Sequence, residues 1–144
     1  MSASLAIELS NEDDRMTNAP PNTPPDDPAL AMSRIWQADC DQLNRFCTTA
    51  SNRERAMFDA PLAERPAAER AYIEARDARD KLSDRLDACA RALEKTKAQS
   101  IEGVAGKIAV TILQNAPEPQ SAEPPWPMLR SCVDDLERLA KRST

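Results

Sequence analysis

Apolar residues recur at alternating steps of four and three along residues 28–58, which places them on one face of a helix. Asp26 or Asp27 can cap this helix, and Pro28 suits the first helical position because no intrahelical bond is lost there. The pattern predicts an amphipathic helix in which Glu54 is the one polar residue at a position of the apolar stripe. The stripe consists of Met32, Trp36, Cys40, Leu43, Cys47, Ala50 and Met57.

A second apolar stripe follows Pro61 and Pro66, two prolines that are hard to place inside one helix. It predicts a helix from about Ala67 to Gln99, with Arg79 at one seam position. The short connection makes the two helices antiparallel neighbours in a long hairpin, residues 27–99. The stripe consists of Tyr72, Ala75, Leu82, Leu86, Cys89 and Leu93.

Two shorter elements complete the pattern. Residues 100–116 follow helical spacing, and Ser100 can cap this helix at its start. The β-branched residues within 107–113 would also suit a buried strand. We favour the helix, because the chain offers no second convincing strand for pairing. A proline-rich loop leads to a last helix within residues 126–142. We therefore expect one all-α domain, residues 27–142, behind a disordered, acidic and proline-rich tail, residues 1–26.

Charge is distributed unevenly over the 144 residues, whose formal net charge is −5. Residues 1–28 carry all of this excess, with six acidic residues and one basic residue, and residues 29–144 are neutral. A neutral body gives no electrostatic attraction to nucleic-acid phosphates or to an anionic membrane surface. We therefore expect neither to be a partner.

No run of apolar residues is long enough for a transmembrane helix. The first fifteen residues lack the basic region and apolar core of a secretory signal. The expected location is the cytoplasm, where the four cysteines remain reduced.

The stretch from Lys95 to Lys107, KTKAQSIEGVAGK, resembles a short helix start of the form x-T/S-x-x-G-x-A-x-K. This start is found in a family of small all-helical proteins from bacterial genomes and their prophages. The opening Asp27-Pro28-Ala29-Leu30 and the segment from Trp126 to Ala140 are also similar to that family. The resemblance implies a long two-helix segment followed by shorter helices, and it implies no activity, because the family has no assigned reaction.

The residue types needed for catalysis are scarce. The chain has no histidine, so a cysteine nucleophile has no imidazole base, and Cys40 and Cys47 are about 10.5 Å apart along one helix, too far for a disulfide. All four cysteines lie on apolar stripes and are interpreted as small buried residues. The aspartates at 80, 84 and 87 share a helix face, which we interpret as a solvated charged face and not a cation site. We expect no enzyme activity, catalytic residue, cofactor or metal.

Glycines at 103 and 106 form a G-x-x-G start without the strand and third glycine of a dinucleotide site. Close packing of this helix on the hairpin explains them better. A DNA-binding helix-turn-helix is also disfavoured, because prolines at 117 and 119 leave no room for a recognition helix.

Arg79 is the residue that fits its stripe least well. It can snorkel, pair with a buried acid such as Asp39, or set register in an assembly, and snorkelling is the default interpretation. The sequence favours a non-enzymatic protein-interaction or assembly module that self-associates or binds a protein; the alternative is a nucleic-acid-associated accessory protein such as a small regulator or phage packaging subunit. The candidate partner contacts are Trp36, Trp126, Arg79, Phe58 and Tyr72, although the sequence favours core positions for the two tryptophans.

Overall fold

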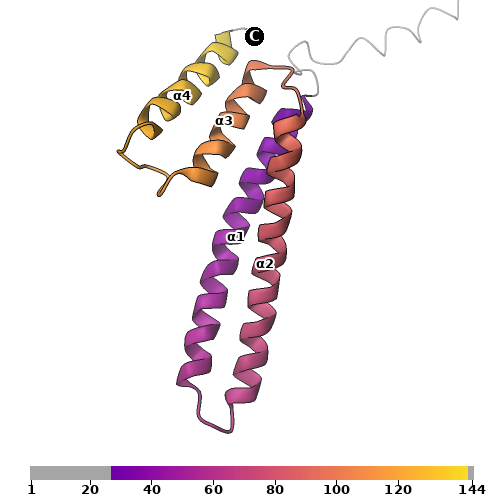
Figure 1. Ribbon diagram of the computed structural model, residues 1–144, viewed down its shortest axis with the longest axis vertical. Coiled ribbons are helices and arrows are strands. Elements are labelled where there is room, and N and C mark those ends of the chain that lie inside the picture. The colour runs from indigo at the N-terminus through magenta and orange to yellow at the C-terminus, as the bar shows by residue number, and fades with distance from the viewer. Residues whose placement is uncertain (1–26, 143–144) are drawn as a thin grey trace, which may run out of the picture.

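The computed structural model describes residues 27–142, which form four α-helices (Figure 1). The expectation of an all-α fold is confirmed for these residues, in which no strand occurs. The tail expected for residues 1–26 lies outside the described part of the chain. The helices are α1 (Pro28–Asp59), α2 (Arg65–Lys95), α3 (Ile101–Asn115) and α4 (Trp126–Arg142).

The start of α1 follows the local chemistry of its first residues. Asp27 has an extended backbone, and its carboxylate accepts a hydrogen bond from the N–H of Ala29 at 3.0 Å. Pro28 takes the first helical position, as expected. At the other end, Ala60 is extended, the conformation favoured for a residue that precedes a proline, and the helix stops at Asp59.

Helices α1 and α2 lie side by side and run in opposite directions (Figure 1). The indole N–H of Trp36 donates to the carbonyl of Leu86 at 3.2 Å, and the guanidinium of Arg53 donates to the carbonyl of Ala71 at 3.1 Å. We call residues 51–74, which include the loop between the two helices, the distal end. Figure 1 places it far from α3 and α4.

The sequence spacing misplaced both ends of α2. The helix begins at Arg65, two residues before the expected start, and ends at Lys95, four residues before the expected end at Gln99. Thr96 is extended, and the N–H of Gln99 donates to the carboxylate of Asp27 at 3.0 Å. If α2 continued to Gln99, this N–H would form a hydrogen bond within the helix. It is instead bonded to Asp27, so the helix ends earlier.

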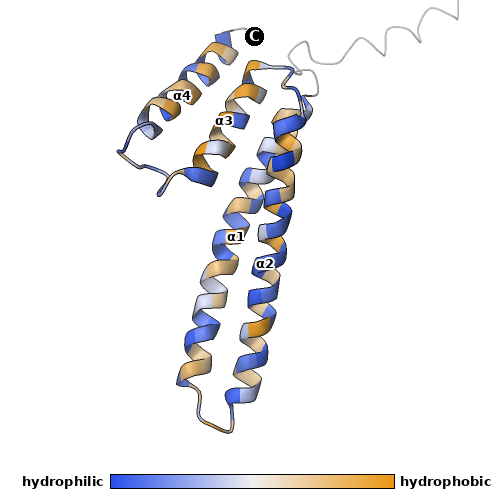
Figure 2. Cartoon of the chain, viewed as in Figure 1, coloured by the Kyte–Doolittle hydropathy of each residue, from blue (hydrophilic) through white to orange (hydrophobic). Residues whose placement is uncertain are grey.

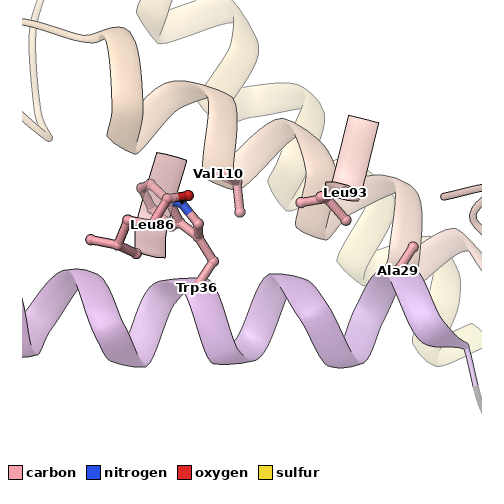
Figure 3. Packing of buried hydrophobic residues seen from close by; sticks show 5 residues of the cluster. All are labelled: Ala29, Trp36, Leu86, Leu93 and Val110. Atoms are coloured by element: carbon pink, nitrogen blue, oxygen red, sulfur yellow. Dashed lines mark hydrogen bonds between the residues drawn. The ribbon is translucent and has the colours of Figure 1, made fainter. Parts of the chain in front are cut away.

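The core lies where α3 meets α1 and α2. Figure 3 shows Ala29 and Trp36 of α1, Leu86 and Leu93 of α2 and Val110 of α3. Trp36 is only 3% exposed. Side chains from three helices thus meet at one end of the long helix pair, and this contact fixes α3 on it.

Residues 107–113 are helical, so the strand alternative for them is wrong. Ser100 caps α3 as expected, because its hydroxyl accepts from the N–H of Gly103 at 3.0 Å. Figure 2 colours much of α2 as hydrophilic with hydrophobic positions at intervals, the pattern of a helix with one buried face. By contrast, α3 contains apolar residues on several of its faces.

Helix α4 packs against α3 and makes no close backbone contact with α1 or α2. The proline-rich loop before it is held by Arg130, whose guanidinium donates to the carbonyls of Ser121 at 2.6 Å and Pro119 at 3.4 Å. The molecule therefore consists of a long helix pair with a short pair attached through α3 (Figure 1).

Candidate functional site

Asp27 joins the starts of two helices. One carboxylate oxygen caps α1 through Ala29. The other accepts hydrogen bonds from the N–H of Gln99 at 3.0 Å and from the hydroxyl of Ser100 at 2.6 Å. Ser100 in turn caps α3 at Gly103. One buried acid therefore holds the N-terminal ends of α1 and α3 together.

The environment of Asp27 favours its charged form. Burial raises the pKa of this carboxyl, but hydrogen bonds from Ser100, Gln99 and Ala29 outweigh burial and hold the pKa below its ordinary value. The negative charge also suits the positive ends of the two helix dipoles. Because every described partner of the carboxylate is structural, we assign Asp27 to the fold and not to a reaction.

The two glycines of α3 allow the helix to approach α1 closely. A Cβ at Gly106 would lie 2.6 Å from the hydroxyl oxygen of Ser33, and a Cβ at Gly103 would collide with the carboxylate of Asp27. Neither glycine has a positive φ, so space and not backbone conformation requires them. The expectation of close packing at these positions is confirmed.

The expected partner residues fall into different environments. Trp36 is a core residue and presents no surface for a partner. Trp126 and Tyr72 are half-buried, and the guanidinium of Arg76 lies 6.0 Å from the centre of the Tyr72 ring. Phe58 is 70% exposed. The distal end therefore holds Phe58 and Tyr72, whereas Trp126 lies at the start of α4.

Arg79 does not pair with Asp39, so that alternative is wrong. Arg79 forms an ion pair with its neighbour Asp80 at 3.0 Å. Asp39 instead forms two hydrogen bonds with Arg85, at 2.8 and 3.1 Å. Arg85 lies on the same helix, two turns from Arg79, and reaches across to α1.

The distal end has no buried side chain. Between Ala50 and Ala75, the nearest buried residues on either side, every residue is half-buried or exposed. Leu62 in the loop is 81% exposed, and Phe58, four residues earlier on α1, is 70% exposed. The fully buried part of the seam between α1 and α2 therefore ends well before the helices do.

A second apolar surface runs along α3 and α4. On α3, Ile101 and Val104 are 38% and 41% exposed, and Ile108 follows them on the same side at helical spacing. On α4, Met128 is 70% exposed and Cys132 is exposed. We call the side chains of these residues, together with the partly exposed Leu139, the outer face.

A groove among α1, α3 and α4 lies on the opposite side of this short helix pair. Its volume is about 380 Å³, and its lining includes Arg34 of α1, Glu102 and Gly106 of α3, and Glu137 of α4. Arg34 and Glu102 are 3.9 Å apart, a weak ion pair. The groove mixes charged and apolar groups and shows no arrangement of a nucleophile with a base.

The cysteines do not all behave as small buried residues. Cys40, Cys47 and Cys89 are half-buried, but Cys132 is exposed, so the expectation of burial is wrong for Cys132. Position 132 lies at the edge of the apolar stripe of α4, where α3 does not cover it. Burial and the charge of Asp41 raise the pKa of Cys40, and burial also raises that of Cys89, which makes both thiols weaker nucleophiles at neutral pH.

Within residues 27–142, no cluster of three or more histidine, cysteine, aspartate or glutamate side chains has a geometry that could hold a metal ion. None of the four described helices combines the length and the apolar character needed to cross a membrane.

No family model matches the chain, and neither does any curated protein or solved structure.

Sequence reasoning missed two features of these surfaces. It identified Asp27 only as a cap of the first helix, because nothing local shows that Gln99 and Ser100 return to the same carboxylate. It also predicted α3 from helical spacing alone and did not identify an exposed apolar side on it. The spread of apolar residues around α3, at positions such as Ile101, Val104 and Leu113, was the available signal, since a helix that is apolar on several sides is normally covered on several sides.

Proposed function

We propose that this protein is a non-enzymatic helical module that binds a protein, or a second copy of itself, through its distal end. The supporting observation is the run from 51 to 74 without a buried side chain, in which Phe58 and Leu62 are 70% and 81% exposed. Exposed apolar side chains that form a patch are typical of protein interaction sites. A cytosolic location belongs to the same proposal.

The charge of the distal end favours a protein over a nucleic acid as the partner. Residues 51–74 contain four basic and five acidic side chains. Just beyond the distal end on α2, Arg76 pairs with Asp77 and Arg79 pairs with Asp80. A surface of this kind lacks the excess positive charge that nucleic-acid binding requires. Mixed charges around apolar anchors instead resemble the polar rim of a protein interface.

The test compares two variants of the full chain. The double variant Phe58→Ser, Leu62→Ser removes the exposed apolar groups of the distal end. Ile35→Ser is the matched control, since Ile35 is 58% exposed on α1 but lies outside the distal end. Each protein is measured by light scattering over a range of concentrations, and each is tagged and recovered from lysate of its native host with and without nuclease.

We expect the unmodified protein and the Ile35→Ser control to form an oligomer or to retain a stoichiometric protein that survives nuclease. The double variant should lose this association and keep its helical circular dichroism spectrum. A strictly monomeric protein that retains no partner would contradict the proposal. Material that is lost on nuclease treatment would also contradict it and would favour a nucleic-acid-associated accessory protein.

A further inference from the structure

The outer face of α3 and α4 is left uncovered by the rest of the described chain. Successive helical residues are about 100° apart, so Ile101, Val104 and Ile108 lie away from Gly106 and Val110, which face α1 and α2. On α4, Glu137 lines the groove toward α1, which places Cys132 on the opposite edge. The apolar edges of both helices thus face the same side.

The size of the outer face limits what can cover it. The exposed fractions of its side chains correspond to on the order of 400 Å² of apolar surface, a patch size that is often functional on a monomer. A stable interface between two proteins takes about 800 Å² from each partner. The face therefore suits a short apolar segment better than a second folded domain.

We propose that the N-terminal stretch Leu5-Ala6-Ile7-Glu8-Leu9 of the same chain covers the outer face. This stretch brings three large aliphatic side chains, about the number that a patch of this size accommodates. This proposal concerns a different surface from the distal end and does not depend on the function proposed above.

The point at which the N-terminal segment joins the fold supports this assignment. Asp27 is hydrogen-bonded to Ser100, and Ser100 directly precedes Ile101, the first residue of the outer face. Seventeen residues separate Leu9 from Asp27, and they span up to about 55 Å when extended. The whole of α3 is only about 22 Å long. The stretch therefore reaches every part of the face.

Charge at this end of the molecule is complementary. Glu8, Glu12, Asp13 and Asp14 accompany the aliphatic stretch. The last turn of α4, which carries Arg142, lies at the same end as the start of α3 (Figure 1). The acidic residues that flank the docked stretch are attracted to this end. An apolar peptide from another protein would have to compete with a segment that belongs to the same chain.

Cys132 reports directly on cover of the outer face. The test measures the rate at which maleimide modifies Cys132 in the full chain, by mass spectrometry of its peptide, with the half-buried Cys40 and Cys89 as internal references. One variant carries Leu5→Ser, Ile7→Ser and Leu9→Ser. The matched control carries Ser4→Ala, Ser10→Ala and Asn11→Ser, which change the neighbours of the stretch but not its aliphatic residues.

We expect the aliphatic variant to react about tenfold faster at Cys132 than the unmodified protein and the control. A segment linked through a short stretch of the same chain has an effective concentration of about 1 mM, so a segment of about 0.1 mM affinity is docked roughly 90% of the time. Val104→Ser should accelerate the reaction as well, and combining it with the aliphatic variant should add little, because both changes release the same contact. Rates measured in urea correct for any change in the thiol itself.

Equal rates in the aliphatic variant and the unmodified protein would overturn the proposal. Protection of Cys132 that increases with protein concentration, and that persists in the aliphatic variant, would also overturn it and would assign the face to a second copy of the chain. An unchanged circular dichroism spectrum ensures that faster reaction reports loss of cover and not unfolding.

Discussion

Gly106→Ala tests whether α3 presses against α1 as closely as the structure shows. Alanine is favoured over glycine inside a helix by about 1 kcal/mol, and Gly106 has a negative φ that alanine accepts. Propensity alone therefore predicts a more stable protein. Packing predicts the opposite, because the new Cβ would lie 2.6 Å from the hydroxyl oxygen and 2.7 Å from the Cβ of Ser33.

The packing penalty should exceed the propensity gain. Both distances are far below the 3.5–4.0 Å at which carbon atoms pack favourably. Ser33 is fully buried and its hydroxyl donates to the carbonyl of Ala29 at 2.8 Å, so it has little freedom to move away. Overpacking of a buried site costs about 1–3 kcal/mol. We therefore expect Gly106→Ala to lower the free energy of unfolding by about 1 kcal/mol.

Urea unfolding followed by circular dichroism measures this change as a lower midpoint with an unchanged slope. Ser33→Gly removes the opposing Cβ, so the double variant Gly106→Ala, Ser33→Gly should show a favourable coupling of about 1 kcal/mol or more in a double-mutant cycle. If Gly106→Ala alone raises the free energy of unfolding by about 1 kcal/mol, the gain in helix propensity exceeds any packing penalty. The close contact between α3 and α1 then does not exist in solution.

Three further predictions concern single contacts. The pKa of Asp27 is lowered by folding, so its contribution is present above the unfolded pKa of about 3.9 and is lost as the pH falls through the lower folded value; melting temperatures between pH 6 and pH 2 should fall more steeply for the unmodified protein than for Asp27→Asn, and parallel curves would contradict this. Arg85→Ala should lower the free energy of unfolding by no more than about 1 kcal/mol, because its ion pair with Asp39 is largely solvated on the arginine side; a loss above 2 kcal/mol in urea unfolding would show that this pair is buried. Trp36→Ala should destabilise by about 3–5 kcal/mol, since a 3% exposed indole is lost from the core together with its bond to Leu86; a change below 1 kcal/mol in thermal or urea unfolding would place Trp36 at the surface.

Sequence signals that act within one helical turn located most helix boundaries. The largest error, at the end of α2, arose where a residue distant in sequence takes part. Asp27, Pro28 and Ser100 act within one turn of their own helices, so sequence reasoning found both starts. The end of α2 depends on the bond between the Gln99 N–H and Asp27, which are far apart in sequence, and the expected end was wrong by four residues.

The candidate surfaces show the same division between local and distant information. Composition indicated a neutral body without histidine, and the periodic stripes indicated helices with one apolar face. They could not tell Trp36 from Phe58, since both are aromatic residues on the first helix. The position of α3 separates them, because it packs on the Trp36 end of the long pair and leaves the Phe58 end uncovered.

The sequence by itself determined the helical class and the capped starts of α1 and α3, because these follow from hydrogen bonding and side-chain size within a few residues. Only the tertiary structure decided that Arg85 and not Arg79 reaches Asp39, that Cys132 is exposed, and that the backbone of α4 lies close to α3 but not to α1 or α2. These outcomes depend on how far one helix is shifted along another and on which faces remain open. Such properties arise from contacts between residues distant in the chain, which no local pattern encodes.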